Sequence, residues 1–262
     1  METKVYAFTC GWLTLPLALL LEGETGKIKV PVPAYLIEHP KGRALFDSGL
    51  HVDTQVDADT RLGRLAPYHS VHFSAGEEIG ARLESLDVDP ARIDFVINSH
   101  LHFDHCGGNQ QLPNATLLLQ RPEWEAGHDA DLIETVYYDP KDYDHGHRVQ
   151  ALDGEHDVFG DGAVVCVPTP GHTPGHQSLR VRTTGGEVVL TGDACYLRRT
   201  LENLHLPTAA WDRGKMLESL RRLRALRDNG AMIVTGHDPE LWETIPQAPA
   251  RLAGRGAQPA RP

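Results

Sequence analysis

One short segment constrains this chain more than any other: NSHLHFDHCGGN, which begins at Asn98. It places three histidines and an aspartate within the six residues 100–105, directly after the apolar run IDFVI. The four residues are His100, His102, Asp104 and His105. Imidazole and carboxylate groups at such close spacing are typical metal ligands. Further ligands for such a site must come from elsewhere in the chain, and we expect them at the ends of other apolar runs.

Three later segments meet this expectation. Each places a histidine or an aspartate after an apolar run and a glycine-containing turn: AVVCVPTPGH, VVLTGD and AMIVTGH. The residues in question are His172, Asp193 and His237. Strand ends that lead into turns are where a rigid scaffold can direct side chains to a common point.

The seven candidate ligands are more than one tetrahedral ion uses. We therefore predict two divalent metal ions that share a bridging carboxylate and a bridging water. The ligand types suit zinc, iron, cobalt or manganese, and zinc is our first expectation. A merely solvated, histidine-rich loop would not explain the three downstream segments.

The remaining chain alternates apolar runs with amphipathic segments, which indicates an α/β fold. Helices are predicted from Ser74, near RPEWEAG, and from Asp212 to Gly230, and strands in the apolar runs between them. Residues 50–73 and 129–147 lack periodicity and are expected to be long loops. Residues 1–246 are expected to form a single domain, followed by a disordered tail at 247–262 of low apolar content.

Composition limits the partners and the location. Lys+Arg 25 against Asp+Glu 36 gives a net charge of −11, which disfavours a nucleic-acid partner. The four cysteines show no C-x-x-C spacing, so we expect reduced thiols in the cytoplasm. Trp12–Leu21 is too short to span a membrane and lacks the flanks of a signal peptide, so we expect a buried strand and turn there.

The motifs also resemble a known family. HLHFDH at 100–105, with GH at His172, GD at Asp193 and GH at His237, resembles the metallo-β-lactamase superfamily. Within it, SHLHFDHCGGN, TPGHTPGHQSL, DACY and TGHDPELW are similar to segments of the N-acyl-homoserine lactonases. The resemblance runs from about Lys4 to Trp242. It implies an αββα sandwich with the site at one edge, between two sheets.

The resemblance also implies a role for each residue. One metal would be held by His100, His102 and His172, the other by Asp104, His105 and His237, and Asp193 would bridge them. A hydroxide bridging the metals would attack the lactone carbonyl. Tyr196 would donate a hydrogen bond to the carbonyl oxygen, and Asp104 would protonate the leaving oxygen of the ring.

Four features favour a lactonase within the superfamily. His102 stands where the oxygen-reducing diiron members typically carry a carboxylate. Asp193 stands where true metallo-β-lactamases tend to have a cysteine. The chain leaves no room for the inserted domain of the nucleases. Tyr196 follows Asp193 by three residues, where the glyoxalase II thioesterases usually have phenylalanine.

Several alternatives stay open. The substrate could be another small lactone, such as a γ-butyrolactone or 4-pyridoxolactone; an apolar pocket would favour acylated lactones, and a tight, positively charged one 4-pyridoxolactone. A thioesterase is disfavoured by Tyr196, and a non-catalytic metal protein by the complete ligand set. Tyr196 could instead be a packed aromatic, and His176 is expected behind the ligands. Segments 12–21 and 50–73 could wall an acyl pocket, or serve as core and a homodimer contact.

Overall fold

The computed structural model describes residues 2–254 and contains two β-sheets. The first has seven strands in the order β4-β1-β2-β3-β5-β6-β7. Its strands are β1 (Lys4–Pro16), β2 (Lys27–His39), β3 (Gly42–Phe46), β4 (Ser70–His72), β5 (Phe95–Ile97), β6 (Thr116–Gln120) and β7 (Val149–Leu152). The second has five in the order β12-β11-β10-β9-β8. They are β8 (His156–Asp157), β9 (Val164–Pro168), β10 (Gln177–Thr183), β11 (Gly186–Leu190) and β12 (Met232–Val234).

Side chains along a strand point to the two faces of the sheet in turn, and in β1 apolar side chains point to both. The first sheet is therefore buried on both faces. Tyr6 and Phe8 of β1 pack into one apolar cluster, whereas their neighbours Val5 and Ala7 pack into another. Side chains of a strand point to opposite faces in turn, so a strand that is apolar at every position needs a cover on each face. The second of these clusters also contains Val181 and other residues of the second sheet, and it is therefore the core between the two sheets.

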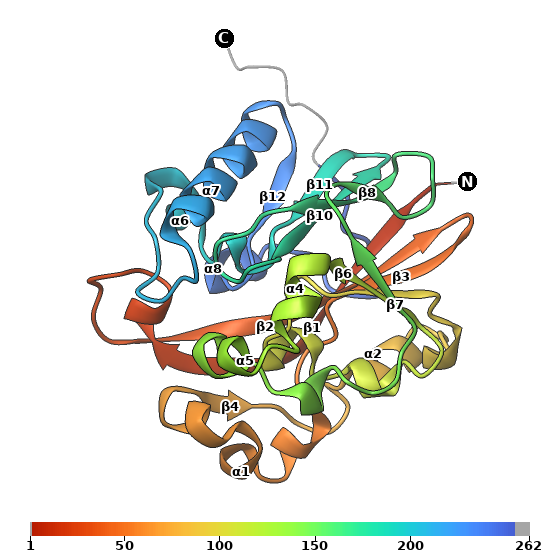
Figure 1. The fold of residues 1–262 in the computed structure, drawn as a ribbon. Helices are drawn as coiled ribbons and strands as arrows, with labels where there is room; N and C mark the ends of the chain where they lie inside the picture. Colours follow the sequence, from red (N-terminus) through yellow and green to blue (C-terminus); the bar gives the residue numbers. More distant parts are fainter. Residues whose placement is uncertain (1, 255–262) are drawn as a thin grey trace.

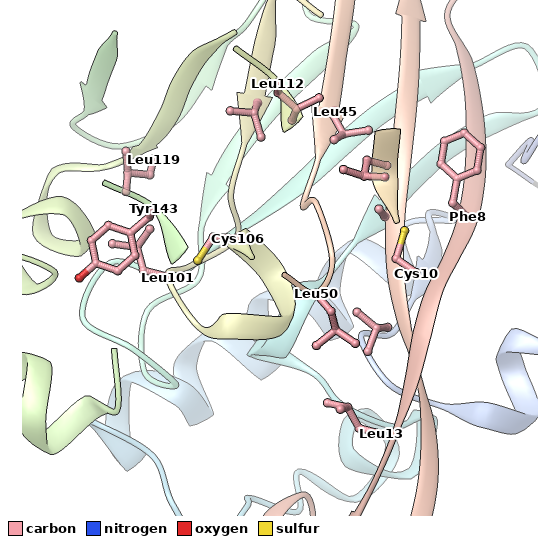
Figure 2. Packing of buried hydrophobic residues seen from close by; sticks show 14 of the residues in the cluster. Phe8, Cys10, Leu13, Leu45, Leu50, Leu101, Cys106, Leu112, Leu119 and Tyr143 are labelled. Carbon is pink, nitrogen blue, oxygen red and sulfur yellow. The ribbon is translucent and has the colours of Figure 1, made fainter. Parts of the chain in front are cut away.

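Helices cover the two outer faces (Figure 1). Their bounds are α1 (Ala58–Leu62), α2 (Ile79–Glu84), α3 (Phe103–Cys106), α4 (Arg121–Ala126), α5 (Ala130–Val136), α6 (Arg198–Asn203), α7 (Arg213–Asp228) and α8 (Pro239–Trp242). Residues of α2, α4 and α5 belong to the cluster on the outer face of the first sheet, part of which Figure 2 shows. Leu220 and Leu223 of α7 pack on the outer face of the second. The predicted αββα sandwich is therefore confirmed.

Individual elements agree with the sequence to different degrees. Helix α7 begins after Asp212, whose side chain accepts a hydrogen bond from the N–H group of Lys215, as predicted. The helix expected from Ser74 starts only at Ile79; the carboxylate of Glu77 does accept a bond from the N–H group of Ser74, but it closes a turn. Segment 12–21 forms the end of β1 and a 3-10 turn, as expected.

Three expectations for irregular segments were wrong. Residues 50–73 contain α1, β4 and two 3-10 turns, and residues 129–147 contain α5. The segment 247–254, expected in a disordered tail, instead lies against β1, with bridges from Gln247 to Ala7 and from Leu252 to Val5. Leu252 is buried there, so apolar contact with β1 orders a segment that has only one large apolar residue. Residues 255–262 lie outside the described part.

The described residues contain no helix that combines the length and the apolar character needed to cross a membrane.

Candidate metal centre

Seven side chains converge where strands of both sheets end. Strand β5 leads into the turn and short helix α3 that carry His100, His102, Asp104 and His105. In the second sheet, β9, β11 and β12 lead respectively to His172, Asp193 and His237. Parallel pairing of β3 with β5 and of β11 with β12 places their carboxyl ends at the same edge, which is why residues distant in sequence meet.

The seven side chains form two adjoining groups. His100, His102, His172 and Asp193 form one, and Asp104, His105 and His237 form the other. Within each group one potential ligand atom per residue lies within 4.8 Å of the others. The structure thus brings together every residue that the sequence suggested as a ligand.

The two oxygens of Asp193 face different groups. Oδ2 lies 3.5 Å from Nε2 of His172 and 3.9 Å from Nε2 of His100. Oδ1 lies 3.0 Å from Nε2 of His237 and 3.3 Å from Nε2 of His105. A carboxylate in this position can serve both groups at once, as a bridging ligand does.

A hydrogen bond to the second ring nitrogen fixes the orientation of each histidine. His102 Nε2 donates to the carbonyl oxygen of Val136 at 2.7 Å, so its Nδ1 faces the centre. The other four present Nε2 to the centre and bond through Nδ1. Their partners are Ser99 Oγ for His100, Asp47 for His105, the Tyr196 hydroxyl for His172 and the Pro31 carbonyl for His237. Such partners hold metal-binding histidines in one tautomer and raise their basicity.

Asp47 is a functional residue that the sequence reasoning missed. Its buried carboxylate accepts hydrogen bonds from His105 Nδ1 at 2.8 Å and from the N–H group of Ser99 at 2.7 Å. Asp47 follows β3 in the run ALFDSG, a pattern close to the one that identified Asp193: an apolar run leads to a carboxylate next to a turn glycine, which here follows the carboxylate instead of preceding it. That pattern could have identified it.

His176 lies behind the ligands, outside both groups. Its Nε2 accepts the N–H group of Asp193 at 3.0 Å, and its Nδ1 lies 2.9 Å from the hydroxyl of Thr169. Burial lowers its pKa to about 3, so the ring is neutral at physiological pH. A neutral His176 can accept this bond and thereby hold the main chain of Asp193.

The electrostatics of the seven side chains fit a cation. Burial lowers the pKa of His100 and of His172 well below the usual range, which keeps both rings neutral. Burial also opposes the charging of His105, but the carboxylates of Asp193 and Asp104 outweigh it and raise its pKa. Two buried atoms, His105 Nε2 and Asp193 Oδ1, have no hydrogen-bond partner. A divalent ion between them would satisfy both, so the residues present fit a metal.

The two cysteines next to candidate ligands do not belong to either group. Cys106 and Cys195 are buried, and burial raises the pKa of both thiols. They are therefore unreactive core residues.

A cavity of about 650 Å³ opens above the two groups. Its floor is formed by ligand side chains, and one wall by leucines from the end of β1 and the following turn. The apolar and aromatic lining residues are Leu13, Leu15, Leu19, Leu20, Leu65, Tyr68, Phe103, Val136, Tyr137, Tyr196, Ala209, Ala210 and Trp211. Among the described residues that line it there is no lysine or arginine. The cavity therefore suits an apolar chain, not an anionic group.

Tyr196 lines the cavity between the two groups. Its hydroxyl lies 2.9 Å from Nδ1 of His172, and its ring stacks on that of His237 with a centroid separation of 6.1 Å. The side chain is thus placed both to contact a bound substrate and to hold a candidate ligand.

Comparisons of the sequence agree with this geometry. Residues 28–237 match the metallo-beta-lactamase superfamily. The N-acyl homoserine lactonase AttM of Azorhizobium caulinodans is 36% identical over 235 residues, which cover 87% of this chain and 89% of the relative. The N-acyl homoserine lactonase AiiA of Bacillus thuringiensis subsp. kurstaki is 31% identical over 222 residues, covering 81% and 83%.

Solved structures give the same result. An N-acyl homoserine lactone hydrolase with the product N-hexanoyl-L-homoserine at its catalytic metal center superposes with a TM-score of 0.87. It is 28% identical, and the match covers 96% of this chain and 100% of that one. A B. thuringiensis AiiA mutant with N-decanoyl-L-homoserine at the active site also gives a TM-score of 0.87, at 27% identity and the same coverage.

Proposed function

Since the chain belongs to the metallo-beta-lactamase superfamily and, within it, to the N-acyl homoserine lactonases, we propose that it is a quorum-quenching hydrolase that opens the ring of N-acyl-homoserine lactones. One observation supports this substrate above the others: a cavity whose described lining is largely apolar and includes no lysine or arginine lies above a pair of metal-ligand groups. The reacting ring would lie over the ligands, and the acyl chain along the leucine wall.

The proposal includes two divalent ions, with zinc as the first expectation. One ion would be held by His100, His102 and His172, and the other by Asp104, His105 and His237. Asp193 would bind both ions. When bound, such ions supply activation of a water for attack and polarisation of a carbonyl oxygen. The neutral state of His100 and His172 supports their part in this set, because only an unprotonated ring nitrogen can bind a metal.

Two residues of the chain would act on the substrate itself. The hydroxyl of Tyr196 is an O–H donor at the cavity wall, and we assign it to the lactone carbonyl oxygen, where negative charge develops. Asp104 also lines the cavity, and we assign to its carboxyl group the transfer of a proton to the ring oxygen that leaves. The product is the ring-opened hydroxy acid.

The cavity also bears on the alternatives. An anionic lactone such as 4-pyridoxolactone would be favoured by a lysine or arginine, and the described lining offers neither. A γ-butyrolactone would leave most of the leucine wall without a contact. Acylated lactones fill the same space with apolar groups, and burial of each methylene contributes about 0.8 kcal/mol.

Initial rates of hydrolysis test the proposal. The metal-loaded protein is assayed with a pH indicator on homoserine lactones of short to long acyl chain, with γ-butyrolactone, 4-pyridoxolactone and a glutathione thioester alongside. We expect turnover of acylated lactones that is lost on chelation and in the His102→Ala variant. Activity on the thioester alone would be consistent with the proposed metal ligands but would show that acylated lactones are not the substrate.

A cytoplasmic location and a homodimer are also part of the proposal. All four cysteines are buried and unpaired, which supports a reducing compartment. The segment 50–73 supports a contact between copies, since Val56 on it is 90% exposed. Light scattering of the wild type and of Val56→Asp tests the homodimer, because a dimer formed through this face should weaken in the variant.

A further inference from the structure

Glu123 is a buried carboxylate that neither ligand group contains. It lies on the short helix α4, and its exposed fraction is 0%. Burial of an ionisable side chain is costly unless its oxygens find donors. Its surroundings therefore explain why this position holds a carboxylate.

Each carboxylate oxygen of Glu123 accepts two hydrogen bonds. Oε1 accepts from the N–H group of Leu101 at 3.1 Å and from the hydroxyl of Tyr138 at 2.6 Å. Oε2 accepts from the hydroxyl of Thr173 and from the N–H group of Gly175, both at 2.8 Å. Leu101 stands between His100 and His102, and Thr173 follows His172. One side chain thus joins the two turns that carry the histidines of the first group.

Two further contacts strengthen this connection. A side chain on Gly175 would place its Cβ 2.2 Å from the main-chain nitrogen of Glu123, so only glycine permits this approach of the turn to α4. Tyr138 is separated by one residue from Val136, whose carbonyl oxygen accepts the Nε2 bond of His102. Glu123 therefore fixes His102 through Leu101 on one side and through the 136–138 segment on the other.

We propose that Glu123 is a positioning residue for one of the two metal ions, the ion held by His100, His102 and His172. It sets the separation of the two turns before the ion binds. This inference depends on the proposed metal centre. The second group, with Asp104, His105 and His237, makes no hydrogen bond to Glu123 among the contacts of the described residues.

The Glu123→Gln variant tests the proposal with little change in shape. An amide has one oxygen and one NH₂ group, and each carboxylate oxygen of Glu123 faces a backbone N–H donor. One of the two N–H groups must therefore lose its acceptor. Zinc-loaded wild type and variant are titrated with a chromophoric chelator, and the release of each ion is followed by absorbance. We expect the dissociation constant of one ion to rise tenfold or more and that of the other to stay unchanged.

Three comparisons make the result specific. His172→Ala and His237→Ala identify which release step belongs to which ion, and Glu123→Gln should affect the same step as His172→Ala. Tyr143→Phe is the matched control, because it removes a buried hydrogen bond from Tyr143 to Gly127 at the end of the same helix and leaves the four hydrogen bonds of Glu123 in place. If Glu123→Gln does not fold, Thr173→Val and Tyr138→Phe each remove one donor and should shift the same step by a smaller factor.

The outcomes separate this inference from the metal centre. Identical release curves for wild type and Glu123→Gln would overturn the positioning role alone. Equal weakening of both ions, matched by Tyr143→Phe, would show that Glu123 serves only general stability. A wild type that bound no zinc would overturn the metal centre and this role together.

Discussion

At the scale of single residues, the hydroxyl of Tyr196 can serve either of two partners, His172 or a bound lactone. Its hydroxyl lies 2.9 Å from His172 Nδ1, and the residue also lines the cavity. We expect Tyr196→Phe to lower kcat/KM for acylated lactones about 100-fold, the usual effect of losing one donor to a developing oxyanion. The phenyl ring keeps the packing, so zinc content should stay at the wild-type value. Loss of zinc in parallel with the rate would instead assign the hydroxyl to His172.

Asp142, which is not one of the candidate ligands, gives the protein a pH-dependent stability. Burial raises the pKa of its carboxyl group from 3.8 to about 7, although Arg61 pairs with it. The folded protein therefore holds this proton more tightly than the unfolded chain does. The stability that this proton contributes is present at low pH and is lost as pH rises toward 7.

The Asp142→Asn variant cannot ionise at this position and should lack that dependence. We expect the free energy of unfolding of the wild type, relative to the variant, to be larger at pH 5 than at pH 8 by about 3 kcal/mol. Urea unfolding of both proteins at the two pH values measures this difference. The same difference at both values would mean that Asp142 is not the titrating group.

At the scale of elements, the segment 50–73 contributes to both the surface and the cavity. Leu65 lines the cavity, whereas Val56 on the same segment is 90% exposed and does not. We expect Leu65→Asp to raise KM for long-chain lactones about tenfold, because loss of apolar contact over one or two methylenes costs about 1.4 kcal/mol.

Short lactones and a second variant serve as controls for the Leu65 prediction. γ-Butyrolactone has no acyl chain to contact Leu65, so its kinetics should be unchanged in Leu65→Asp. Val56→Asp should leave the kinetics of every lactone unchanged. An equal rise in KM for long and short substrates in Leu65→Asp would show that the acyl chain does not contact Leu65.

Elements were predicted best where local chemistry alone defines them. The start of α7 follows from Asp212 as an N-cap and from apolar residues at helical spacing. The start of α2 does not, because the bond between Glu77 and Ser74 resembles a helix cap but closes a turn before Ile79. The described part of the C-terminal segment pairs with β1, and nothing local in its composition indicates that contact.

At the scale of the whole molecule, the metal ions would connect the two sheets. Histidines that follow β5 of the first sheet and residues that follow β9, β11 and β12 of the second meet in one centre. Binding to the folded state alone stabilises a protein, by about 4 kcal/mol at a ligand concentration 1,000 times Kd. We expect chelation to lower Tm by about 10 °C and added zinc to restore it. A Tm that chelation leaves unchanged would argue against the centre.

The sequence by itself determined the fold class and the set of candidate ligands. Both follow from local patterns: apolar runs of strand length, and a histidine or aspartate where such a run ends. The tertiary structure alone decided which residues support those ligands and what the cavity admits. Asp47 reaches His105 across 58 positions of the chain, and Glu123 reaches Gly175 across 52. The first bond depends on the pairing of β3 with β5 within one sheet, and the second depends on how the two sheets pack. No local pattern encodes either distance.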